Sequence, residues 1–109
     1  MVVIMNYKTH NEIGGMSIDG TSYQGEISAN YADLDMLFGA PLLGDGYKTD
    51  AEWWVQFDDG TLATIYNWKN GRNYMGDDGL DIKDITEWNI GGKCKQALYM
   101  VIKAIETQV

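Results

Sequence analysis

Residues 53–65 read Trp-Trp-Val-Gln-Phe-Asp-Asp-Gly-Thr-Leu-Ala-Thr-Ile, and this stretch decides how the fold is interpreted. Apolar side chains alternate with other types on both sides of the Asp-Asp-Gly at 58–60, which is typical of two strands joined by a tight turn. The sequence suits a three-residue turn with its glycine in the left-handed conformation. The register that follows has the cross-strand pairs Trp53–Ile65 and Val55–Ala63.

The second face of this hairpin mixes aromatic and polar side chains. In the register above it carries Glu52, Trp54, Gln56, Leu62, Thr64 and Tyr66. A slip of one residue would exchange the two faces, because strand side chains alternate with a period of two. The aromatic groups, together with Trp68, either anchor an interface with a partner or lie under a second layer of the same chain. The sequence leaves both interpretations open.

Before the hairpin, the sequence predicts a strand and then a helix. Residues 21–27 alternate as a strand does, and the hydroxyl of Ser28 is placed to cap the helix that follows. The helix has an apolar stripe at three- and four-residue spacing, made of Tyr31, Leu34, Leu37 and Phe38. Gly39 and Pro41 end it. Residues 4–20 are polar and punctuated by glycine, and residues 1–20 fit either a hairpin turning at Asp19-Gly20 or a flexible arm.

After the hairpin, the sequence predicts a polar loop at 69–79, a last short strand at 85–90 and a C-terminal helix entered through Gly91-Gly92. The apolar stripe of that helix is expected to be Cys94, Leu98, Val101, Ile102 and Ile105. The expected fold is therefore α+β, an antiparallel sheet with a central helix and a C-terminal helix packed on one face. Residues 1–109 are expected to form a single domain.

The charge is distributed unevenly along the chain. The net charge is −8, and the ten carboxylates within residues 1–68 face only Lys8 and Lys48, whereas the rest of the chain is neutral. Such a field repels nucleic acid and attracts basic surfaces, so we expect a basic protein partner and no direct nucleic-acid binding. The residues expected to bind that partner are Asp33, Asp35, Asp45, Asp50, Glu52, Asp58 and Asp59, with Trp54 and Tyr66.

The composition limits the class and the compartment. Cys94 is the one cysteine, so an internal disulfide is excluded, which fits a reducing cytosol. The apolar N-terminal run is five residues long, too short for a secretory signal, and no run approaches the roughly 20 apolar residues that span a membrane. The sequence predicts a cytoplasmic protein without membrane attachment.

Catalytic and metal-binding patterns are weak. Cys94 falls on the predicted apolar stripe, so we expect a core thiol, and His10 lies in a polar stretch and is expected at the surface. The acids of the 77–84 loop lack the alternating ligands and distal glutamate of a calcium loop. We therefore expect no enzyme, no metal and no cofactor.

Gly91-Gly92-Lys93 is a candidate anion site. At a helix start, free backbone amides and a lysine could hold a phosphate. Paired glycines also let a strand turn sharply into a helix, and the pattern matches no phosphate-binding fingerprint. The structural interpretation is the simpler of the two, and the anion site stays as an alternative.

Four segments of the chain resemble small accessory proteins of tailed bacteriophages. They are Tyr-Ala-Asp-Leu-Asp-Met-Leu-Phe-Gly-Ala-Pro at 31–41, Gly-Asp-Gly-Tyr-Lys-Thr-Asp-Ala-Glu-Trp at 44–53, Phe-Asp-Asp-Gly-Thr-Leu-Ala-Thr-Ile-Tyr-Asn-Trp-Lys at 57–69 and Trp-Asn-Ile-Gly-Gly-Lys at 88–93. The resemblance spans about residues 20–105 and brings no known functional residues with it. It implies a phage or mobile-element protein that acts inside a bacterium.

Setting and charge together favour an anti-CRISPR-like inhibitor that binds a host nucleic-acid-binding defence protein. Carboxylates spaced over a rigid surface can imitate the phosphates of DNA, so a DNA mimic is one form of this hypothesis. The alternative is a binding protein that sequesters a nucleotide ligand at Gly91-Gly92-Lys93. The sequence also leaves a homodimer open, since symmetric dimers are the commonest oligomers.

Overall fold

The computed structural model describes residues 7–10, 18–43 and 48–108. The predicted partner residue Asp45 and most of the stretch before residue 18 lie outside these ranges. The helices and strands are β1 (Tyr7–Thr9), β2 (Ser22–Ser28), α1 (Tyr31–Phe38), β3 (Glu52–Phe57), β4 (Leu62–Tyr66), α2 (Arg72–Met75), β5 (Glu87–Gly92) and α3 (Gln96–Gln108). Two short 3₁₀ turns, η1 (Gly76–Asp78) and η2 (Ile82–Asp84), lie between α2 and β5.

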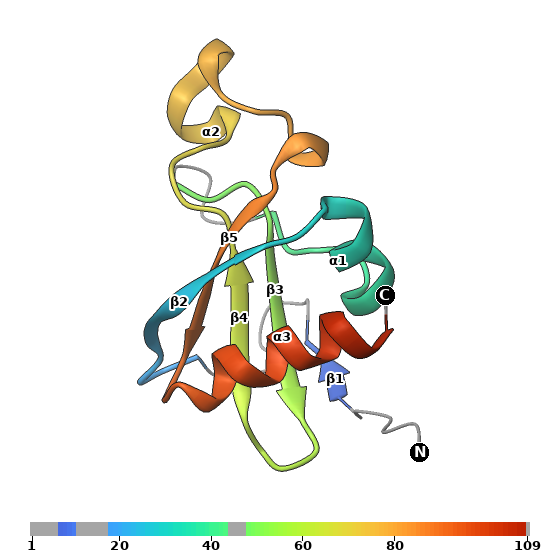
Figure 1. The fold of residues 1–109 in the computed structure, drawn as a ribbon. Coiled ribbons are helices and arrows are strands. Elements are labelled where there is room, and N and C mark those ends of the chain that lie inside the picture. The colour runs from blue at the N-terminus through green and yellow to red at the C-terminus, as the bar shows by residue number, and fades with distance from the viewer. Residues whose placement is uncertain (1–6, 11–17, 44–47, 109) are drawn as a thin grey trace.

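The five strands form one antiparallel sheet in the order β1-β3-β4-β5-β2. Figure 1 shows α3 lying across one face of the sheet with α1 beside it, while α2 and the 3₁₀ turns extend beyond one end of the strands. The predicted α+β class, with a central and a C-terminal helix on one face, is confirmed. In the described residues no helix has the length and apolar character needed to cross a membrane.

The β3–β4 hairpin has the predicted register. Trp53 pairs with Ile65 and Val55 with Ala63, and all four side chains are fully buried. Gly60 closes the three-residue turn with a φ of 88°, a conformation that glycine adopts without steric cost. The predicted inward face of this hairpin is therefore the core face.

Two tryptophans at the centre of the core also hold α1 in place. Trp53 and Trp88 meet edge to face, with ring centroids 5.2 Å apart. The Trp88 indole N–H donates to the carbonyl of Ala29, 2.9 Å away and just before α1. The Trp53 indole N–H donates to the carbonyl of Gly39, 2.7 Å away and just after α1. The two indoles thus satisfy backbone acceptors at both ends of one helix.

The predicted cap of α1 was wrong. The N-cap position is Asn30, whose side chain makes no capping bond. Ser28 is the last residue of β2 and its hydroxyl instead donates to the carboxylate of Glu87, 3.1 Å away on β5. The strand continues one residue further than its alternation suggested, because Ser28 has a partner on β5.

The C-terminal helix starts later than expected, at Gln96, and two alanines are among its most deeply buried residues. Ala97, Val101 and Ala104 are fully buried there. Cys94 precedes the helix and is exposed, so the predicted core thiol was wrong. The other predicted stripe residues do face the core: Val101 is fully buried, and Leu98, Ile102 and Ile105 pack against it while partly exposed. Ala97 and Ala104, which the predicted stripe did not include, are also fully buried.

The close packing of α3 on the sheet requires a residue without a side chain at position 92. A Cβ added there would collide with the Cβ of Ala97 and lie 3.2 Å from the carbonyl oxygen of Leu62. The glycine therefore lets the first turn of α3 lie against the sheet backbone.

The N-terminal part agrees with its prediction in one respect. Asp19-Gly20 is a turn, in which the Thr21 N–H donates to the Ile18 carbonyl at 3.1 Å. β1 pairs with β3 and β2 pairs with β5, so these two strands lie at opposite edges of the sheet. The residues that would form the first arm of a hairpin turning at Asp19-Gly20 lie mostly outside the described ranges.

We expect Gly92→Ala to lower the free energy of unfolding by about 1–3 kcal/mol, as overpacking of a core does. Chemical denaturation measures this. The control is Ala97→Gly, which removes the methyl group that the new Cβ would meet. In the Ala97→Gly background the Gly92→Ala substitution should cost clearly less, and equal costs in both backgrounds would contradict the assigned contact.

Candidate functional site

The sheet face opposite α1 and α3, which we call the far face, carries two rows of residues that cross four strands. The first row is Glu52, Tyr66, Asn89 and Glu26, and the second is Trp54, Thr64, Gly91 and Tyr23. Neighbouring strands lie about 4.8 Å apart, so the two carboxylates at the ends of the first row are separated by roughly 14 Å. An acidic row thus lies beside a row that begins and ends with an aromatic residue.

Gly91 makes a hollow in the second row. A Cβ at this position would lie 2.5 Å from the Thr64 hydroxyl and 3.5 Å from the Tyr66 ring, so any other residue would fill the space above the strand. The result is a cleft of about 300 Å³. Its lining includes Tyr23, Glu52, Thr64, Tyr66, Trp68 and Gly91. Its size is at the lower end of the range for small-molecule pockets, and its aromatic walls and single carboxylate suit a side chain from a partner.

The electrostatics of the cleft keep Tyr66 protonated. Burial, and next the charge of Glu52, raise the pKa of the Tyr66 phenol above its ordinary value of 10, while a hydrogen bond with Asn89 acts in the opposite direction. The pKa of Tyr23 is also raised, through desolvation first and then through Glu26. Both phenols are therefore neutral at physiological pH, and each has a hydrogen-bond partner on the far face, Asn89 for Tyr66 and Glu26 for Tyr23.

Trp68 forms the outer wall of the cleft and is 44% exposed. Its ring lies edge-on to Tyr66, with centroids 6.2 Å apart. The ammonium groups of Lys48 and Lys69 lie 5.3 and 5.6 Å from the Trp68 ring centroid, within the range of cation–π attraction. Trp54 and Tyr66 are half-buried and Trp68 is exposed, so these aromatics stay candidates for an interface.

The predicted partner-binding acids do not gather on one surface. Asp33 and Asp35 lie on α1, on the other side of the sheet from Glu52. Asp58 and Asp59 lie at the tip of the β3–β4 hairpin, far along the strands from α1 in Figure 1. Of the predicted acids that the structure describes, only Glu52 lies on the far face.

Asp50 was predicted to touch a partner, and this was wrong because the residue is buried, with 5% of its surface exposed. Its carboxylate accepts hydrogen bonds from the Asn67 side-chain amide at 2.8 Å and from the Asn73 backbone N–H at 3.1 Å. Asn67 in turn accepts from the backbone N–H groups of Asp50 and Ala51 at 2.7 and 3.1 Å. The pair thus joins the start of β3, the end of β4 and the first turn of α2.

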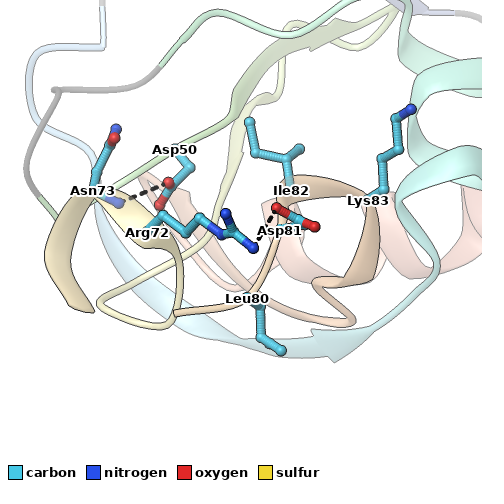
Figure 2. A pocket seen from close by; sticks show the side chains of 7 residues that line it. All are labelled: Asp50, Arg72, Asn73, Leu80, Asp81, Ile82 and Lys83. Carbon is cyan, nitrogen blue, oxygen red and sulfur yellow. Dashed lines mark hydrogen bonds and ion pairs between the residues drawn. The ribbon is translucent and has the colours of Figure 1, made fainter. Parts of the chain in front are cut away.

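A second hollow, of about 510 Å³, lies between α2 and η2. Figure 2 shows its side chains, which are Asp50, Arg72, Asn73, Leu80, Asp81, Ile82 and Lys83. Arg72 and Asp81 form an ion pair of 3.0 Å across it, each with 57% of its side chain exposed. The carboxylate of Asp50 is already hydrogen-bonded within the chain, and the guanidinium of Arg72 is already ion-paired with Asp81. This hollow is therefore a weaker ligand site than the cleft.

The helix-start geometry behind the candidate anion site is absent. Gly91 and Gly92 belong to β5 and pair with β2 on one side and β4 on the other, while Lys93 is exposed in the link to α3. Their amides are therefore not the free N–H groups of a helix N-terminus. The two glycines serve opposite faces of the sheet, Gly91 the cleft and Gly92 the contact with Ala97.

Groups suited to catalysis or metal binding do not cluster in the part of the chain that the structure describes. There, no set of three or more His, Cys, Asp and Glu side chains could hold a metal ion. His10, which is half-buried rather than fully at the surface, has its Nε2 3.2 Å from the Oε1 of Gln56. What the far face offers chemically is recognition through carboxylates, phenols and aromatic rings.

No protein-family model, no curated protein and no solved structure matches this chain.

Sequence reasoning missed Glu26, Asn89 and the cleft-forming role of Gly91. The alternation of residues 21–27 and 85–90 contains a signal for the face on which each side chain lies. The same alternation contains no signal for the order of the strands in the sheet. In the structure β5 lies between β4 and β2, although β2 precedes β3 in the chain.

We expect Asp50→Ala to lower the free energy of unfolding by about 3 kcal/mol, because it leaves the buried amide of Asn67 and the N–H of Asn73 without their acceptor. Urea denaturation of both proteins tests this. The matched control is Asp35→Ala, an exposed acid whose loss should change stability by less than about 0.5 kcal/mol. Equal effects of the two substitutions would refute the structural role of Asp50.

The hairpin tip should contribute to stability in a pH-dependent way. The Thr61 side chain first, and then its backbone N–H 2.9 Å from the carboxylate, hold the pKa of Asp59 below its ordinary value of 3.8. A lowered folded-state pKa stabilises the protein above the unfolded-state pKa, and this stabilisation is lost as the pH falls through the folded-state value. The native protein should therefore exceed Asp59→Ala in melting temperature at neutral pH, and the difference should vanish well below pH 3.8. A difference that persists in acid would contradict the assigned bond.

Proposed function

We propose that the protein is a non-enzymatic inhibitor that binds the basic, nucleic-acid-contacting surface of another protein. The observation that supports this best is the far face, where Glu52 and Glu26 end one row and Trp54 and Tyr23 end the next. The sequence resemblance to phage accessory proteins is the reason to place the partner among bacterial defence proteins, as for an anti-CRISPR protein.

The chemistry of the far face matches arginine and lysine. A guanidinium group can pair with a carboxylate and stack on an aromatic ring at the same time. Glu52 and Tyr66 supply both kinds of partner in one cleft, whereas the ring of Trp68 already faces the ammonium groups of Lys48 and Lys69. Half-exposed tyrosine and tryptophan side chains are also the residue types that dominate binding energy in protein interfaces.

The acids away from the far face have a different role in this proposal. Asp33 and Asp35 on α1 and Asp58 and Asp59 at the hairpin tip add to a net charge of −8. Charges of this kind speed the encounter with a basic surface and contribute less to the affinity of the final complex. Because these acids lie on separate surfaces, the proposal is contact through the far face rather than a continuous imitation of DNA phosphates.

The experiment is a pull-down with the tagged chain from a bacterial lysate that contains a CRISPR effector, at low and high salt, with mass spectrometry of the retained proteins. We expect a nucleic-acid-binding protein at low salt, released by high salt or by added DNA. Glu26→Lys with Glu52→Lys should reduce its capture at least tenfold.

The matched control is Asp77→Lys with Asp78→Lys, which makes the same change of charge in η1, away from the far face. It should retain most of the capture. If both double variants lose capture equally, net charge is the cause and the far-face proposal fails. If Asp58→Lys with Asp59→Lys has the largest effect, the hairpin tip is the contact instead.

A further inference from the structure

The outer edge of β2 is an unpaired sheet edge among the described strands. β2 ends the strand order and pairs with β5 alone. The N–H of Ala29 donates to the Thr86 carbonyl at 2.9 Å, toward β5. Because backbone groups alternate in direction along an antiparallel strand, Ile27 also faces β5, whereas the N–H and C=O groups of Glu26 and Ser28 point outward.

The first half of β2 is less suited to adding another strand. The pairing with β5 shifts between Tyr23 and Gly25, as in a β-bulge, and the carbonyl of Gln24 accepts a hydrogen bond of 2.8 Å from the Lys95 ammonium. Bulges and lysine side chains are the usual means by which proteins block an edge strand. The segment 26–28 has neither, and it is the part of the edge where outward backbone groups remain available.

A groove of about 270 Å³ lies beside this segment, between β2 and α3. Its apolar lining is Ile27 with Ile102 and Ile105, which are packed against the core but still partly exposed. Two acidic residues also line it: Glu106 on α3, and Glu26, which stands at the edge of β2 with its strand position on the far face. On the far-face side of the same edge, Glu26 is followed by Ser28, whose hydroxyl holds the carboxylate of Glu87.

We propose that the 26–28 edge binds an extended segment of the partner protein as an additional strand. Main-chain bonds to Glu26 and Ser28 would hold the segment, and its side chains would alternate between the two faces. Those directed to the helix side enter the groove of Ile102 and Ile105 and are apolar. Those directed to the far face meet Glu26 and Glu87 and are basic. The occupant is thus a segment in which apolar residues alternate with arginine or lysine.

The charge favours this occupant over a second copy of the chain. Antiparallel pairing of β2 with β2 about Ile27 would bring the Glu26 and Glu87 carboxylates of both copies to one side of the joined sheet. Like charges on neighbouring strands are destabilising, whereas a basic segment pairs with them. The inference rests on the proposed function in one respect, the basic character of the partner.

The test uses a labelled nine-residue peptide in which valine and arginine alternate, with fluorescence anisotropy as the readout. Ser28→Pro removes an outward N–H without removing a donor to β5, and Ser28→Ala keeps that N–H but loses the bond to Glu87. We expect the wild type and Ser28→Ala to bind within a factor of two of each other. Ser28→Pro should bind at least tenfold more weakly, with its fold checked by circular dichroism. A peptide of alternating valine and glutamate should not bind.

Amide hydrogen exchange of the wild type gives a second readout that does not depend on the folding of a variant. The N–H groups of Glu26 and Ser28 should become protected when the arginine peptide is added. Equal binding by Ser28→Pro and Ser28→Ala, or protection elsewhere, would overturn the inference. Self-association that Ser28→Pro abolishes would show that the edge joins two copies instead.

The outcomes also separate this inference from the proposed function. If Glu52→Lys abolishes capture of the partner while Ser28→Pro captures it fully, the far-face proposal stands and the edge inference fails. If the arginine peptide binds the β2 edge but no basic protein is retained from the lysate, the edge inference stands and the proposed function fails.

Discussion

The contact between Trp53 and Trp88 is the interaction on which the rest of the structure depends. Their rings meet at 5.2 Å in the middle of the core, and their indole N–H groups bond the carbonyls at the two ends of α1. A buried indole N–H without an acceptor is costly, so the position of α1 follows from that of the two rings. Tyr7 extends the same arrangement, since its hydroxyl donates to the Leu37 carbonyl at 2.7 Å.

The helices α1 and α3 cover one sheet face, and the candidate binding surface lies on the other. Gly91 and Gly92 show the division most clearly, because adjacent strand residues point to opposite faces. The missing side chain of Gly92 lets Ala97 approach, and that of Gly91 leaves the cleft open. One glycine pair therefore serves packing on one side and the shape of a candidate binding surface on the other.

The sequence predictions that were confirmed concern local periodicity. The hairpin register of Trp53 and Ile65, the turn at Gly60 and the end of α1 at Gly39 depend on residues close together in the chain. The predictions that were wrong concern burial and partners. Cys94 is exposed because α3 begins two residues after it, and Asp50 is buried because Asn67 and Asn73 supply donors from distant segments.

What the sequence by itself determined is the face of the hairpin to which each side chain belongs, since alternation has a period of two and the Asp-Asp-Gly turn sets the register. Only the tertiary structure decided which strands are neighbours. β5 lies between β4 and β2, and this order places Glu26 in the row of Glu52 and leaves β2 at an edge. Strand order depends on how the whole chain packs its core, and no local pattern in residues 22–28 or 87–92 encodes it.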